Sequence, residues 1–135
     1  MKRYVLDCSV SVAWILEDEA SSAADRFLDL LADGEAVVPT LWIVEMANAL
    51  VVAERRRRIN RSDVTEALEL LSELPITVHA EPRSMMVGLC ELAREHDLSA
   101  YDACYIDLAR RLRLPLASLD RRQTAAANAA SVELL

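Results

Sequence analysis

Four acidic residues of this chain stand in or directly after apolar runs: Asp7, Glu45, Asp102 and Asp120. Two of them, Asp7 and Asp120, end such runs, and the other two lie within them. Burying an ionised carboxylate is unfavourable unless the group is paired with a cation or binds a metal. Because no Lys or Arg interrupts these runs, the pattern indicates a shared metal site.

The ligand type restricts which metal such a site would hold. Carboxylate oxygens without His or Cys favour Mg²⁺, with Mn²⁺ as the alternative, over zinc. Mg²⁺ usually takes only one or two carboxylates directly, and we expect these to be Asp7 and Asp102. Glu45 and Asp120 are expected to bind directly or through water. Since no Ser/His or Cys/His pair suggests covalent catalysis, metal-assisted hydrolysis of a phosphodiester is the simplest chemistry.

Each carboxylate also has a structural interpretation. The spacings Ser99-x-x-Asp102 and Asp120-x-x-Gln123 are those of helix capping boxes, in which the acid only stabilises a helix start. A structural Glu45 would require a buried salt bridge, and the acid after the first apolar run could simply end a strand. Taken singly, capping explains a carboxylate as well as catalysis does. Taken together, the four positions favour one site.

Three polar residues are candidates for orienting the carboxylates, because each lies two residues or one helical turn from a predicted ligand: Ser9, Asn48 and Ser118. Turn and cap roles fit the two serines equally well, and Ser9 is also the expected cap of the first helix. Asp107 lies five residues after Asp102 on another face of the same helix, where we expect it to be solvated.

Short apolar runs alternate with helical patterns along the chain, and the predicted strands are 4–6, 36–39, 76–78, 116–118 and 132–134. This order predicts an α/β fold with a mostly parallel five-stranded sheet and helices on both faces. In such sheets, ligands bind beyond the carboxyl ends of the strands. If the first and fourth strands are neighbours, Asp7 and Asp120 face each other there. With 135 residues, 53% of them hydrophobic, the chain is expected to form one domain over 1–135.

Composition narrows the function classes further. The net charge of −7 is unlike that of most nucleic-acid binders, although a metal and a local Arg patch can reverse the field at a site. The run Arg55 to Arg58 with Arg61 is either a solvated helix end or a contact to RNA or a partner. The three cysteines lack metal-ligand spacing and are expected to be reduced. Without a signal sequence or membrane span, the chain is expected to be soluble and cytoplasmic.

Four pieces of the sequence occur together in one known family: residues 5–9, Pro39 with 44–50, residues 98–103 and residues 116–120. In this order they resemble PIN-domain ribonucleases, in particular the VapC-type toxins of bacterial and archaeal toxin–antitoxin operons. The resemblance covers essentially the whole chain. Asp97 and Ser131 depart from the pattern, since the family often has Gly at both positions. Neither departure touches the four carboxylates.

The resemblance implies a Mg²⁺-dependent endoribonuclease whose substrate is RNA and whose products carry 5′-phosphate and 3′-hydroxyl ends. It also implies a small antitoxin that covers an apolar groove and inserts a basic side chain among the carboxylates. The apolar helix faces are compatible with a homodimer as well. These expectations define the predicted function, a toxin that cleaves RNA.

Two other functions remain open on the sequence alone. The first is an acidic-pocket phosphatase or phosphoryl-transfer domain. A receiver domain would need a late lysine, where Lys2 is the only lysine, and a haloacid-dehalogenase-like phosphatase would need Asp in place of Ser9. Gly34 and Gly88 are too few for a P-loop or dinucleotide site. The second is a catalytically silent binding module, which would show no Mg²⁺-linked stabilisation.

Overall fold

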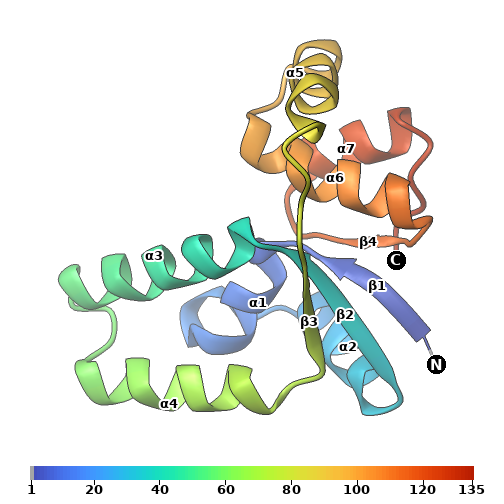
Figure 1. The fold of residues 1–135 in the computed structure, drawn as a ribbon. Helices are drawn as coiled ribbons and strands as arrows, with labels where there is room; N and C mark the ends of the chain where they lie inside the picture. The colour runs from blue at the N-terminus through green and yellow to red at the C-terminus, as the bar shows by residue number, and fades with distance from the viewer. Residues whose placement is uncertain (1) are drawn as a thin grey trace.

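Four parallel strands alternate with helices in the computed structural model, which describes residues 2–135 (Figure 1). The strands are β1 (Lys2–Leu6), β2 (Gly34–Pro39), β3 (Ile76–His79) and β4 (Leu116–Ala117). They pair in the order β3-β2-β1-β4. The predicted adjacency of the first and fourth strands is confirmed, with Val5 in register with Leu116 and Leu6 with Ala117. Since all strands are parallel, their carboxyl ends share one edge, called here the carboxyl edge.

Seven α-helices connect and cover the strands: α1 (Cys8–Ile15), α2 (Ser22–Asp29), α3 (Leu41–Arg55), α4 (Arg61–Glu73), α5 (Met85–His96), α6 (Ala100–Leu112) and α7 (Arg121–Ala129). Two 3₁₀ turns, η1 (Glu17–Glu19) and η2 (Leu30–Ala32), follow α1 and α2. Figure 1 shows α1–α4 on one side of the molecule and α5–α7 on the other. Within residues 2–135, no helix has the length and apolar character needed to cross a membrane.

The predicted fifth strand at 132–134 is wrong, because the sheet has four strands. That segment makes only an isolated parallel bridge between Leu134 and Leu116. The turn before it has Ser131 in the left-handed region, with φ 63°. The neighbouring strand β4 is itself only two residues long, and it therefore offers little edge to pair with.

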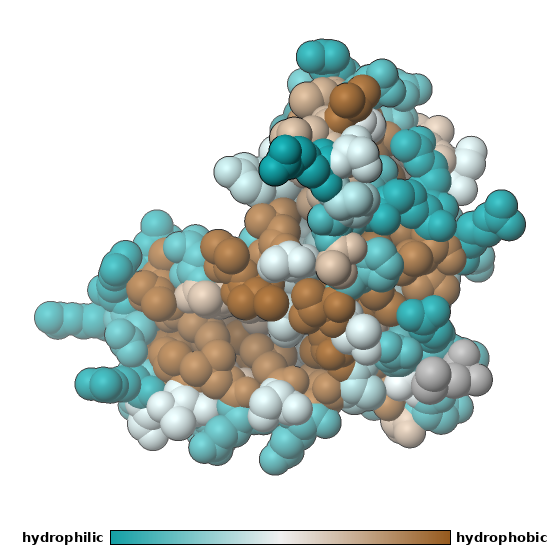
Figure 2. Space-filling view, in the orientation of Figure 1, coloured by the Kyte–Doolittle hydropathy of each residue, from teal (hydrophilic) through white to brown (hydrophobic). Residues whose placement is uncertain are grey.

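The apolar run around Glu45 forms α3, and only one face of this helix is buried. Trp42, Met46 and Leu50 of α3 are buried, whereas Val44 is 64% exposed. Figure 2 shows apolar side chains at the surface over the part of the molecule that α3 and α4 form. This helix is held against α1 by a chain of polar contacts. Trp42 Nε1 donates to Ser11 Oγ at 2.9 Å, and Ser11 Oγ donates to Met46 Sδ at 3.1 Å.

The solvated position expected for Asp107 is also wrong. Its carboxylate is buried, and Oδ2 accepts a hydrogen bond from Arg111 Nε at 2.7 Å, one helical turn away. The same guanidinium contacts Glu81 in the connection between β3 and α5. The sequence shows the four-residue spacing of the pair, but it could not show that this face of α6 packs against the connection that carries Glu81. Asp107 therefore ties α6 to the β3–α5 connection.

Replacing this carboxylate is expected to destabilise the fold. Asp107→Ala removes the acceptor of the Arg111 Nε–H and leaves Glu81 as the remaining carboxylate beside the guanidinium, which should lower the free energy of unfolding by about 1–3 kcal/mol. Urea denaturation measures the loss. Asp25→Ala, which removes an exposed carboxylate from α2, should change stability by no more than about 0.5 kcal/mol. Equal stabilities of the two variants would contradict a structural role for Asp107.

Candidate active site

Two of the four predicted carboxylates begin helices at the carboxyl edge. Asp7 follows β1 and is the N-cap of α1, and its Oδ2 accepts from the Ser9 backbone N–H at 3.1 Å. Asp120 is the N-cap of α7, and its Oδ1 accepts from the Gln123 backbone N–H at 3.0 Å. Because β1 and β4 are neighbours, both caps lie at adjacent strand ends. Capping and membership of a common site are therefore compatible roles.

The other two carboxylates come from α6 and α3. Ser99 is the N-cap of α6, and its Oγ accepts from the Asp102 backbone N–H at 3.1 Å. The expected capping at this helix thus comes from the serine, and the Asp102 carboxylate lies one turn in. Glu45 lies in the second turn of α3, where its Oε1 accepts a hydrogen bond from the Tyr105 hydroxyl of α6. This contact links the two helices beside the carboxylates.

The pKa shifts show that these acids lie close enough to repel one another. Burial raises the pKa of Asp7, and the charge of Asp120 raises it further, against hydrogen bonds from Ser9 and Gln123. Burial also raises the pKa of Glu45, whose deprotonation is opposed by the charges of Asp7 and Asp102. Like charges held this close together mark sites that a cation would stabilise.

Asp102 completes the cluster. Burial raises its pKa, and the charges of Asp120 and Asp7 add to that rise. A hydrogen bond to Ser99 and the nearby Arg122 guanidinium act in the opposite direction. These charge effects link Asp7, Asp102 and Asp120 to one another, and they link Glu45 to Asp7 and Asp102.

Gln123 is a site residue that sequence reasoning missed. Its side chain is fully buried, and Nε2 donates to Asp7 Oδ1 at 3.1 Å and to the Asp102 carbonyl at 3.2 Å. Its Oε1 accepts from Ser118 Oγ at 2.6 Å. One amide thus joins the ends of β1 and β4 to the first turn of α6. The available signal was a lone Gln in an Ala-rich helix, which we interpreted as half of a capping box.

Tyr105 was missed in the same way. It lies one helical turn after Asp102 and is fully buried, yet its hydroxyl reaches Glu45 on another helix. Its spacing from Asp102 places both side chains on one face of α6. That spacing was the signal in the sequence.

The three accessory residues have different surroundings. Ser118 Oγ lies 3.4 Å from Asp7 Oδ2 and accepts from the Asp120 backbone N–H at 3.1 Å. Ser9 is inside α1 rather than its cap, and its Oγ accepts from the Leu119 N–H at 3.0 Å. Asn48 is exposed on α3, and within the described chain the side-chain hydrogen bond to Glu45 comes from Tyr105 instead.

The carboxylate oxygens are suitable ligands for a hard divalent cation, although they do not converge into a closed coordination shell. Among residues 2–135, no three His, Cys, Asp or Glu side chains converge as a ready-made metal cluster. Mg²⁺ does not require one, because it usually binds one or two carboxylates and keeps several waters. The oxygen-only chemistry and the mutual charge repulsion of the four acids both suit such an ion.

Removing one of these charges should not harm the protein when divalent ions are absent. We expect Asp102→Asn in EDTA to be at least as stable as the wild type, because the change relieves repulsion from Asp7 and Asp120. Ser99→Ala should instead lose about 1 kcal/mol with the helix cap. Urea denaturation compares the two. A clear loss of stability in Asp102→Asn would make its carboxylate a structural group.

Comparison with known proteins identifies the family. The PIN domain matches residues 4–129. Ribonuclease VapC9 of Mycobacterium tuberculosis is 33% identical over 120 residues, which cover 87% of this chain and 86% of that protein.

Solved structures share the fold. VapBC2 from Rickettsia felis, bound to a DNA fragment from its promoter, has a TM-score of 0.72 at 12% identity over 98% of this chain and 97% of that one. A toxin–antitoxin complex from Klebsiella pneumoniae has a TM-score of 0.62 at 15% identity over 90% of each chain. With one family spanning nearly its whole length and a relative of this similarity, the chain belongs to the PIN domain family.

Proposed function

We propose that the chain is a divalent-metal-dependent endoribonuclease that acts as the toxin of a toxin–antitoxin pair. The observation that carries this proposal is the position of three aspartates around Gln123 at the carboxyl edge, where it contacts Asp7, Asp120 and the Asp102 carbonyl. Glu45 is held beside them by the Tyr105 hydroxyl, and its charge interacts with those of Asp7 and Asp102. The relatives of the chain support the choice of RNA, since the similar protein of M. tuberculosis is named a ribonuclease. A metal-dependent phosphodiester hydrolase needs such a cation site, whereas a silent binding module does not.

The four carboxylates would have different roles in binding the metal ion. Asp7 and Asp102 would hold Mg²⁺ or Mn²⁺ directly, with Glu45 and Asp120 binding directly or through water. A cation bound there would offset negative charge on the phosphoryl oxygens and favour deprotonation of the attacking water.

Side chains behind the carboxylates orient them. The Gln123 amide and the Ser9 N–H hold the two oxygens of Asp7 from different sides. The Tyr105 hydroxyl holds Glu45. Small displacements of catalytic groups can cost about 100-fold in rate, and these buried partners restrict such displacements.

The one thiol beside the carboxylates is unsuited to a covalent route. Burial raises the pKa of Cys8 well above its usual range, and the charges of Glu45 and Asp7 raise it further. The thiolate is the nucleophilic form, so Cys8 is a poor nucleophile at neutral pH. Direct hydrolysis by water therefore remains the simplest mechanism.

Incubation with mixed cellular RNAs tests the activity. We expect cleavage with Mg²⁺ but not with EDTA, products with 5′-phosphate ends, and a melting temperature that rises with the ion. Asp7→Asn and Glu45→Gln should each reduce cleavage by about 100-fold or more. Glu91→Gln, which alters an exposed carboxylate on α5, should cleave normally. Equal thermal shifts in wild type and Asp7→Asn would place the ion elsewhere.

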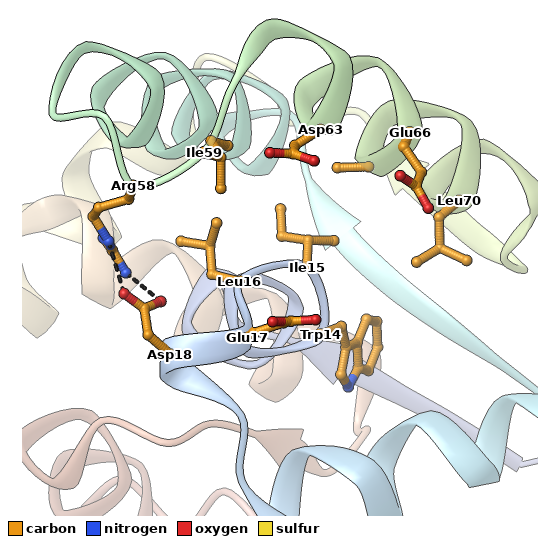
Figure 3. A pocket seen from close by; sticks show the side chains of 11 residues that line it. Trp14, Ile15, Leu16, Glu17, Asp18, Arg58, Ile59, Asp63, Glu66 and Leu70 are labelled. Carbon is orange, nitrogen blue, oxygen red and sulfur yellow. Dashed lines mark hydrogen bonds and ion pairs between the residues drawn. The ribbon is translucent and has the colours of Figure 1, made fainter.

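A pocket lined by both apolar and acidic side chains suits the second part of the proposal, an antitoxin partner. It has a volume of about 540 Å³ and lies between α1 with η1 and α4 with the turn before it (Figure 3). Its apolar side chains include Trp14, Ile15 and Leu70, and its carboxylates include Glu17, Asp63 and Glu66. Arg58 closes one end through two hydrogen bonds to Asp18, at 2.7 and 3.0 Å. The solved complex from K. pneumoniae is a toxin–antitoxin pair with this fold. We infer that a segment of the antitoxin with apolar and basic side chains occupies this pocket.

A further negative charge in the pocket should prevent neutralisation by the antitoxin without reducing toxicity. Expression of Leu70→Glu should still arrest growth, because Leu70 is 46% exposed and distant in sequence from the carboxylates. Co-expression of the antitoxin from the same operon should no longer relieve the arrest. Leu68→Glu, at an equally exposed position of α4 outside the pocket lining, is the matched control and should be neutralised normally. Neutralisation of Leu70→Glu would exclude this pocket.

A further inference from the structure

Tyr101 is an exposed aromatic residue beside the carboxylates. Its side chain is 63% exposed, whereas Tyr4, Phe27, Trp42 and Tyr105 are each no more than 8% exposed and Trp14 is half-buried. Among residues 2–135, the other aromatic rings are therefore used for packing, and Tyr101 is not. Its surroundings indicate what such a ring could bind.

The helix places Tyr101 on the side of α6 that faces the site. It lies directly before Asp102 and one turn before Tyr105, and residues four apart share a helix face. Tyr105 reaches across to Glu45 on α3. The ring of Tyr101 thus stands at the solvent end of the face that carries both a predicted metal ligand and the partner of another.

Cationic groups lie near the Asp102 carboxylate. Arg122 donates to the Asp97 carbonyl at 3.0 Å and to its carboxylate at 3.2 Å, in the connection just before α6. Arg121 is exposed and directly follows Asp120. These guanidinium groups supply positive charge to a chain of net charge −7 at the place where a polyanion would have to approach.

We propose that Tyr101 stacks on an unpaired base next to the cleaved phosphodiester and so positions the RNA at the carboxylates. The inference rests on the proposed function and assigns a substrate-positioning residue to that site. Aromatic side chains stack on bases of any identity, and they do so with unpaired bases because duplex RNA covers the base faces. The hydroxyl of Tyr101 is not needed for this contact, but the ring is.

The binding test uses the full chain with Asp7→Asn as an inactive background. The probe is a short single-stranded oligoribonucleotide of randomised sequence that contains 2-aminopurine, whose fluorescence is quenched by stacking. Tyr101→Ala should weaken binding by about 5- to 150-fold and reduce quenching. Tyr101→Phe should preserve both, and Tyr101→Leu should lose both. Val87→Ala, at a 68% exposed position on α5, should bind as the parent does.

Cleavage separates this inference from the proposed function. In the otherwise unaltered protein, Tyr101→Ala should reduce cleavage of a single-stranded RNA and leave slow cleavage of the same sequence within a stem unchanged. If the wild type cleaves RNA but Tyr101→Ala binds and cleaves equally well, or if Tyr101→Leu retains quenching, stacking by Tyr101 is wrong. If the wild type cleaves no RNA with Mg²⁺, the proposed function itself fails.

Discussion

The buried carboxylate of Asp7 is the constraint on which the rest of the site depends. It is only 5% exposed, and every element around it supplies a polar contact or a charge. The start of α1 supplies an N–H, α7 supplies the Gln123 amide, and the neighbouring strand end supplies the Ser118 hydroxyl. A buried charge without such partners would be very costly. The position of α7 and the end of β4 are thus set by one acidic side chain.

Helix starts explain how several carboxylates can share so small a region. The N-termini of α1, α6 and α7 all lie at the carboxyl edge, and each has one of the aspartates at its cap or in its first turn. A helix N-terminus carries partial positive charge, which favours a nearby carboxylate. This stabilisation offsets part of the repulsion between the acids. The same aspartates that begin these helices are therefore available to bind a cation.

The sequence could predict the parts of this arrangement that follow from local rules. Apolar runs located the four strands, and the acids at their ends gave Asp7 and Asp120, which adjacent strands bring together. It could not predict contacts that depend on packing between distant elements. Gln123 has the spacing of a capping residue but turns its side chain toward Asp7. Asp107 was expected to be solvated, but its carboxylate is buried and accepts a hydrogen bond from Arg111. The fifth strand failed because pairing also requires a long enough neighbour, and β4 has two residues.

The contact between Gln123 and Asp7 also has a consequence for the time at which activity appears. The two residues are 116 positions apart, so the first strand is synthesised long before its partner leaves the ribosome. A nascent chain that lacks α7 has neither Asp120 nor the amide that holds Asp7. Long-range contacts of this kind form late in folding because closing so large a loop costs entropy first. The geometry thus delays completion of the carboxylate site until translation has passed Gln123.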